Sequence, residues 1–140
     1  MKVQSPKASA SCYGVEYALI DAEGWVHPYP RPLMLRNGSP EQTPTPASEF
    51  GASTGAARAR VRWAVALRYA AGGTWTVRPV PQSEGVLLLL RHTPHVWAES
   101  PRLVGVVEQA MAGAACWVGE RGEVEAAAEA ILALVGKEAD

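Results

Sequence analysis

The clearest hydrophobic pattern in the chain covers residues 60–69 (RVRWAVALRY), where apolar or aromatic residues alternate with arginine or alanine. Such alternation predicts a half-buried strand, because successive side chains of a strand point to opposite faces. Residues 75–80 also alternate, and the intervening AAGG (70–73) is typical of a turn. We therefore predict a β-hairpin with aromatic side chains toward a core and arginines outward.

A second hairpin is predicted from the alternation in residues 12–19. The DAEG sequence at 21–24 has the chemistry of a tight turn, and residues 25–35 would return as the partner strand. Pro28, Pro30 and Pro32 remove backbone donors from one side of that strand, which predicts a protected sheet edge. The alternative is a polyproline II segment that a groove on another protein binds.

Three further elements follow toward the C-terminus. The continuous apolar run GVLLLLR (85–91) predicts a strand inside the sheet, covered on both faces. Ser100 and Pro101 predict a helix start, and apolar residues follow at helical spacing. A last helix is predicted over residues 123–135, with these residues buried: Val124, Ala127, Ala128, Ile131, Leu132 and Val135. Residues 114–118 fit either a helix end or a short strand.

These elements predict an α+β fold, in which an antiparallel sheet of four to five strands (two hairpins plus one central strand) carries two C-terminal helices on one face. We expect one domain over residues 12–140 and a flexible tail over residues 1–11. Residues 37–57 are rich in Pro, Ser, Thr and Gly, and predict a long flexible loop. Phe50 in that loop either packs back onto its own domain or anchors a neighbouring protein.

Charge is nearly balanced over the whole chain but uneven along it. The formal net charge is -1, so no overall field attracts nucleic acid or an anionic membrane. Residues 56–91 hold six arginines and one glutamate (6 − 1 = +5), whereas residues 119–140 hold six acids and two bases (2 − 6 = −4). With no apolar run long enough to span a membrane, we expect a cytoplasmic protein, or one in a particle assembled in the cytoplasm.

Residues 18–24 (ALIDAEG) resemble the LAGLIDADG motif of homing endonucleases. The resemblance implies a helix whose terminal acid, here Glu23, binds a catalytic metal. The chain departs from that family elsewhere, because the preceding residues alternate like a strand and three prolines follow. A hairpin turn explains the same letters.

One candidate ligand pocket gathers tryptophans and histidines, which can serve acid/base chemistry. Its residues are Trp25, His27, His92, His95 and Trp97. Tryptophans at such positions are as commonly plain core. No P-loop, nucleophile elbow or zinc-protease motif occurs, so we assign no catalytic residue, no metal site and no cofactor.

The arginine face and the loop form the other candidate site, for a protein partner or self-association: Phe50, Arg58, Arg60, Arg62, Arg68 and Arg78. The favoured function is a non-catalytic interaction or assembly protein, such as a small virion component or an accessory modulator of a larger assembly. A small-ligand or enzyme domain is the alternative. Binding of nucleic-acid phosphates is the second alternative, because Trp63 and Trp75 would face away from the arginines and could not stack bases.

Overall fold

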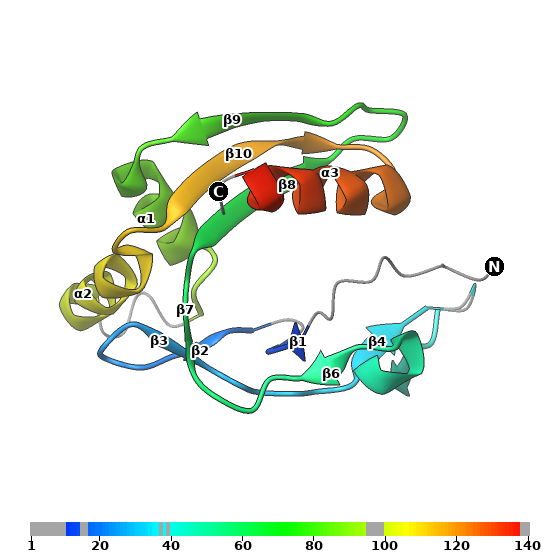
Figure 1. The fold of residues 1–140 in the computed structure, drawn as a ribbon, viewed down its shortest axis with the longest axis horizontal. Helices are drawn as coiled ribbons and strands as arrows, with labels where there is room; N and C mark the ends of the chain where they lie inside the picture. The colour runs from blue at the N-terminus through cyan, green and yellow to red at the C-terminus, as the bar shows by residue number, and fades with distance from the viewer. Residues whose placement is uncertain (1–10, 15–16, 37, 39, 95–99, 138–140) are drawn as a thin grey trace. The chain divides into compact units, whose positions relative to one another are not determined.

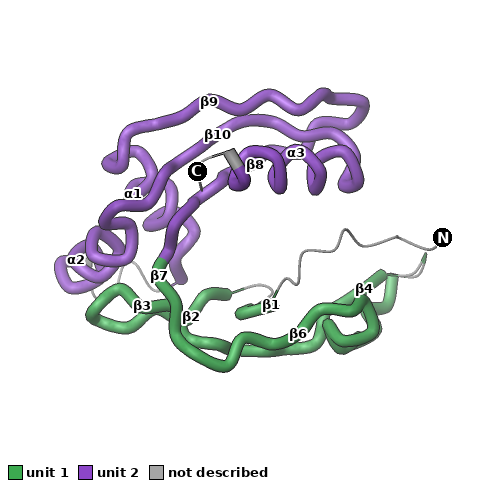
Figure 2. Tube along the Cα trace, viewed as in Figure 1, with its two compact units in different colours: residues 1–60 green, residues 61–140 purple. Residues whose placement is uncertain are grey.

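The computed structural model describes residues 11–14, 17–36, 38, 40–94 and 100–137 of the chain. The described residues form α-helices and several small sheets, which confirms a mixed α and β fold (Figure 1). The chain forms two compact units, residues 1–60 and residues 61–140 (Figure 2), where the sequence predicts one domain. Within the described residues the sheets have two or three strands each, rather than the four to five expected of a single sheet.

The second unit contains a three-stranded sheet made of β8 (Trp63–Tyr69), β9 (Thr76–Val80) and β10 (Ala115–Arg121). β10 is the central strand, parallel to β8 and antiparallel to β9 (Figure 1). Both strands of the predicted hairpin exist, but their direct pairing is wrong because β10 lies between them. The open question over residues 114–118 is thereby answered, since most of that stretch is strand.

Glycines allow the end of β10 to lie close to β9 and to the connection that precedes β9. The Ala70 amide donates to the Arg121 carbonyl at 2.9 Å, so the connection follows the end of β10 closely. A Cβ atom on Gly122 would collide with the Gly73 carbonyl, and one on Gly119 would collide with the Thr76 carbonyl. Both positions therefore require a residue without a side chain.

Helix α1 (Gln82–Arg91) occupies the place where the sequence predicts a central strand, and that prediction is wrong. Glu84 lies in its first turn and Arg91 in its last, so both charges match the helix dipole. A short apolar run does not separate a strand from a buried helix by periodicity. The flanking charges were the signal for a helix.

The two predicted C-terminal helices are confirmed as α2 (Ser100–Met111) and α3 (Val124–Lys137). Ala127 is buried as expected, but Val124 is 61% exposed and Leu132 is 47% exposed. Ala128 is exposed as well, so the predicted buried face of α3 is rotated from the observed one.

The core of the second unit forms on the sheet face that carries Ala64, Cys116 and Val80, which lie side by side across the three strands. Val86 of α1 and Val107 and Met111 of α2 complete this cluster. Arg68 and Arg78 lie on the same sheet face, farther along their strands. The helices α1 and α2 therefore pack on the face predicted to be outward, because alanine and cysteine leave room for them.

The first unit consists of short strands. β2 (Leu19–Ile20), β3 (Trp25–His27) and β7 (Ala59–Arg60) form one antiparallel sheet. β4 (Leu33–Leu35) pairs with β5 (Thr43–Thr45), and β1 (Ser11–Cys12) pairs in parallel with β6 (Ser53–Thr54). A 3-10 helix, η1 (Ala47–Phe50), precedes β6.

The turn between β2 and β3 is confirmed, and it excludes the helix that the LAGLIDADG resemblance implies. Gly24 takes a positive φ of 78°, which favours glycine. The prolines at 28, 30 and 32 follow β3 rather than lying in it, and β3 is the central strand of its sheet, so the predicted protected edge is wrong. Within residues 37–57 the structure places β5, η1 and β6, and the flexibility of this segment stays a prediction. Residues 1–10 of the predicted tail lie outside the described residues.

Apolar burial differs sharply between the two units. Among the described residues of the chain, every buried hydrophobic one lies in the second unit: Val80, Val86, Val107, Ala110, Met111, Cys116 and Ala127. The first unit exposes five large hydrophobic side chains (Tyr17, Leu19, Tyr29, Met34 and Phe50), and the second unit, which does have a buried core, exposes four (Tyr69, Leu87, Val124 and Leu132). The strands of the first unit are held mainly by backbone pairing and by polar and stacking contacts.

Candidate interaction surface

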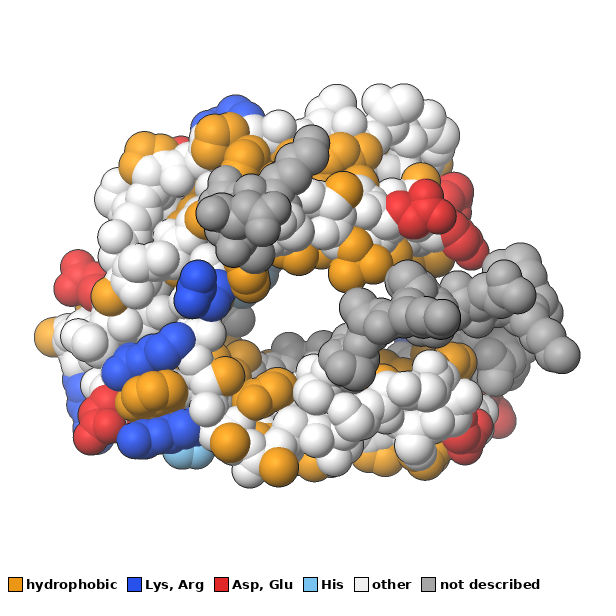
Figure 3. Space-filling model, in the orientation of Figure 1, with side chains coloured by type: hydrophobic (Ala, Val, Ile, Leu, Met, Phe, Trp, Pro, Cys, Tyr) orange, Lys and Arg blue, Asp and Glu red, His pale blue; other side chains and the backbone are white. Residues whose placement is uncertain are grey.

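A stack of charged and aromatic side chains lies on the first unit, where β3 pairs with β7. Trp25 and Arg60 are directly opposite in this pairing. The guanidinium carbon of Arg60 lies 3.8 Å from the centre of the Trp25 ring, and that of Arg58 lies 4.4 Å from it. Figure 3 shows an apolar side chain between two basic ones at this surface. We call these three residues the arginine–tryptophan stack.

Glu23 connects the two arginines of the stack. Its carboxylate Oε2 lies 3.5 Å from Arg58 Nη1, and its backbone carbonyl accepts a hydrogen bond from Arg60 Nη1 at 2.5 Å. The Arg58 and Glu23 side chains are 50% and 71% exposed, so water screens this ion pair and it adds little stability. With Glu23 included, the group carries a formal net charge of +1.

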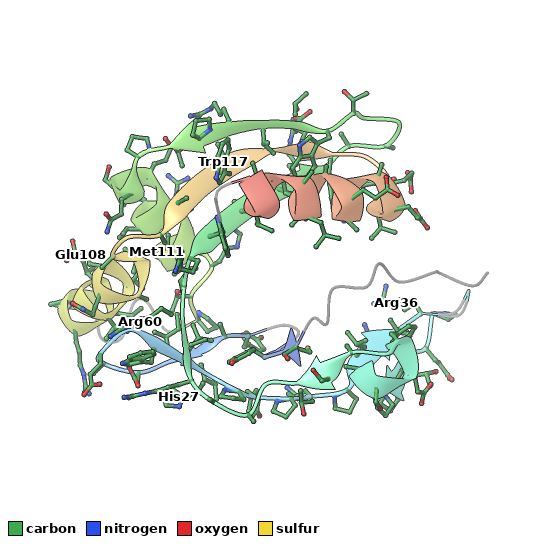
Figure 4. The ribbon with its side chains drawn as sticks, in the orientation of Figure 1. His27, Arg36, Arg60, Glu108, Met111 and Trp117 are labelled. Carbon is green, nitrogen blue, oxygen red and sulfur yellow. The ribbon has the colours of Figure 1, made fainter. Side chains whose placement is uncertain are left out.

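Asp21 organises the turn beside the stack. Its Oδ1 accepts hydrogen bonds from the amides of Glu23 and Trp25, both at 2.9 Å. Its Oδ2 lies 2.7 Å from Nε2 of His27, which Figure 4 shows on this unit. The hydrogen bond with His27 is the main cause that lowers the pKa of Asp21, and the Trp25 amide adds to it. The carboxylate therefore holds the turn in its ionised form.

The predicted arginine face is divided between the two units. Arg58 and Arg60 meet in the arginine–tryptophan stack, whereas Arg62, Arg68 and Arg78 belong to the second unit. There, Arg68 pairs with Glu120, and Arg78 Nη2 lies 3.2 Å from Glu84 Oε1. The Arg62 guanidinium lies 5.7 Å from the centre of the Trp63 ring. The acids of β10 and α1 thus partly neutralise the arginines of the second unit.

The remaining predicted site residues belong to different units or to different elements. Phe50 ends η1 and is 56% exposed. His27 lies in the first unit and His92 in the second, where it caps the C-terminus of α1. His95 and Trp97 fall outside the described residues. Within the described part of the chain, no group of three His, Cys, Asp or Glu residues could hold a metal ion.

Sequence reasoning missed the stack and the roles of Asp21 and Glu23 in it. The spacing of Arg58 and Arg60 places both on the same side of a strand, and that parity was a usable signal. The neighbouring sequence does not specify which strand pairs with the one that carries Arg60. Trp25 is more than thirty positions away, so only the strand pairing brings it to the arginines.

Comparisons of the chain with protein-family models, with curated proteins and with solved structures found no match. Among the described helices, none has the length and apolar character needed to cross a membrane.

Proposed function

We propose that this chain is a non-catalytic interaction or assembly protein, acting as a small component of a particle such as a virion or as an accessory modulator of a larger assembly. One observation carries the proposal: among its described residues, the first unit buries no hydrophobic side chain and exposes five large ones. Ordering a chain costs roughly 1–2 kcal/mol per residue in backbone entropy, which apolar burial normally offsets. A partner that covers these side chains would supply the missing burial.

The composition of the exposed surface supports a protein partner. Tryptophan and arginine are enriched among the residues that dominate binding energy at protein interfaces. The first unit presents both in the arginine–tryptophan stack, together with Phe50 on the segment 37–57. The proposal therefore assigns binding to these residues, with Arg62, Arg68 and Arg78 of the second unit as further contacts, and places the protein in the cytoplasm or in a particle assembled there.

Light scattering after size-exclusion chromatography, followed by a pull-down from the source cells, tests the proposal. The intact chain should self-associate or capture a defined partner. Replacing Phe50 by serine should weaken that association about tenfold or more, as expected of an interface anchor. Leu87→Ser is the matched control, because Leu87 is 57% exposed and lies in the second unit. A monomer that captures no partner, or equal losses in both variants, would contradict the proposal.

A further inference from the structure

We infer that the arginine–tryptophan stack is the binding site for an acidic segment of a protein partner. The two guanidinium groups would bind the carboxylates of that segment. The inference rests on the proposed function, because it requires a protein partner. It goes beyond that function in naming the chemistry that the partner must present.

The stack holds two guanidinium groups against one aromatic ring. Contact with the Trp25 ring at 3.8 Å and 4.4 Å restricts both arginine side chains before any partner arrives. A guanidinium plane presents parallel N–H donors that match the two oxygens of a carboxylate. Because these side chains are already ordered, less conformational entropy is lost when a carboxylate binds.

The stack already holds acceptors of this kind within its own chain. The Glu23 carboxylate lies beside Arg58, and the Glu23 carbonyl accepts from Arg60. A carboxylate and a peptide carbonyl are the acceptors that an acidic peptide offers. β7 is also an edge strand of its sheet, with no further strand beside it among the described residues, so an extended segment could lie along it.

The same geometry disfavours single-stranded nucleic acid. Sites for nucleic acid need aromatic faces on which bases stack, but two guanidinium groups already lie over the Trp25 ring. Affinity for a polyanion also grows with the number of phosphates neutralised. Two arginines with Glu23 between them give a formal net charge of only +1.

Binding of a fluorescein-labelled octaglutamate peptide to the full chain, at low and at physiological salt, tests the inference. A single-stranded oligothymidylate of the same length is the competing probe. The wild-type chain should bind octaglutamate more tightly than the oligonucleotide. The double variant Arg58→Lys/Arg60→Lys keeps both charges but loses the planar donors, so its affinity for octaglutamate should fall on the order of tenfold.

Glu23→Gln should change the affinity for octaglutamate in the opposite direction. Removing the carboxylate that competes for Arg58 should tighten octaglutamate binding several-fold, on the order of the twofold to fivefold effect of an exposed ion pair. A purely structural role for Glu23 would instead weaken binding or leave it unchanged. The indole N–H signal of Trp25 in an NMR spectrum, assigned with Trp25→Phe, should shift during the titration.

The matched control is Arg91→Lys/Arg102→Lys, which changes two exposed arginines of the second unit. It should leave the affinity for octaglutamate unchanged. Equal losses in both lysine variants, tighter binding of the oligonucleotide, or no binding of octaglutamate would each overturn the inference. The last result would leave the proposed function standing if Phe50→Ser still weakens capture of a partner that is not acidic.

Discussion

Gly85 lets α1 pack closely against Cys116 of β10. A Cβ atom there would collide with Cys116 Sγ and would lie 3.1 Å from Met111 Cε, and all three residues are buried. We expect Gly85→Ala to destabilise the second unit by about 1–3 kcal/mol, because adding a methyl group to a closely packed core forces neighbours to move. Urea unfolding, followed by the circular dichroism of the helices, measures this change.

Gly105 provides the control for that substitution. It lies within α2, is exposed, and a Cβ atom built there has nothing within 4 Å. Gly105→Ala should therefore stabilise the chain by about 0.5–1 kcal/mol, the usual gain in helix propensity. If both substitutions shift the unfolding midpoint in the same direction, the packing of α1 on β10 is not as described.

Asp21 makes the turn of the first unit sensitive to acid. Hydrogen bonding with His27 lowers the pKa of Asp21 below its ordinary value of 3.8, so the folded turn favours the ionised carboxylate. The stabilisation is present above pH 3.8 and is lost as the pH falls through the lower folded pKa. Hairpin amide signals in NMR spectra should therefore show an acid transition below pH 3.8.

The variant Asp21→Asn separates this effect from general acid unfolding. Its amide oxygen still accepts from the backbone, but the side chain no longer titrates. The transition should disappear from the hairpin amides of this variant. An unchanged transition would assign the acid sensitivity to another group.

At the scale of elements, local patterns predicted element types better than they predicted neighbours. Alternation in residues 63–69 and helical spacing after Ser100 show which side chains of an element share one face. This information is local, so β8 and α2 could be predicted. β10 pairs with positions about fifty residues earlier in β8 and about forty residues earlier in β9, and no local pattern specifies either pairing. The sheet face of Ala64 and Cys116 was not predicted to be buried, because these small residues contribute little to a hydrophobicity pattern.

The candidate site could also be predicted only as far as local sequence patterns reach. Arg58 and Arg60 could be nominated from the sequence because clustered arginines are a local feature. Their contact with Trp25 depends on the pairing of β3 with β7, and their link to Glu23 depends on the turn that Asp21 organises. Both conditions belong to the folded unit, so the stack could not be predicted from spacing alone.

β10 should be the slowest-exchanging strand of the protein. Its residues pair with β8 on one side and with β9 on the other, whereas among the described residues β8 and β9 each pair on one side only. Amides held between two strands open only when the sheet itself unfolds. Hydrogen exchange followed by NMR should give protection factors at Cys116–Glu120 about tenfold or more above those of β9. Equal protection in β9 and β10 would contradict the central position of β10.

At the scale of the whole molecule, apolar burial differs between the two units, and under the proposed function this difference assigns stability to the second unit and binding to the first. The second unit has a buried core that joins its sheet to α1 and α2. The first unit relies on a hairpin, a cation–π stack and short strand pairs, each of which contributes about 1 kcal/mol or less. Stability should therefore come mainly from residues 61–140, and partner binding should further stabilise the strands of the first unit.

Fragments of the chain test this division. Residues 61–140, made alone, should unfold cooperatively in urea and give dispersed NMR signals, because their core cluster lies entirely within that range. Residues 1–60 alone should exchange their amides rapidly, because none of their described hydrophobic side chains is buried even in the full chain. Adding the binding partner should slow that exchange in the β2–β3–β7 sheet first, since the arginine–tryptophan stack lies there. A cooperatively folded fragment 1–60 without any partner would show that backbone pairing and the stack suffice to stabilise it, and the first unit would then need no partner for its order.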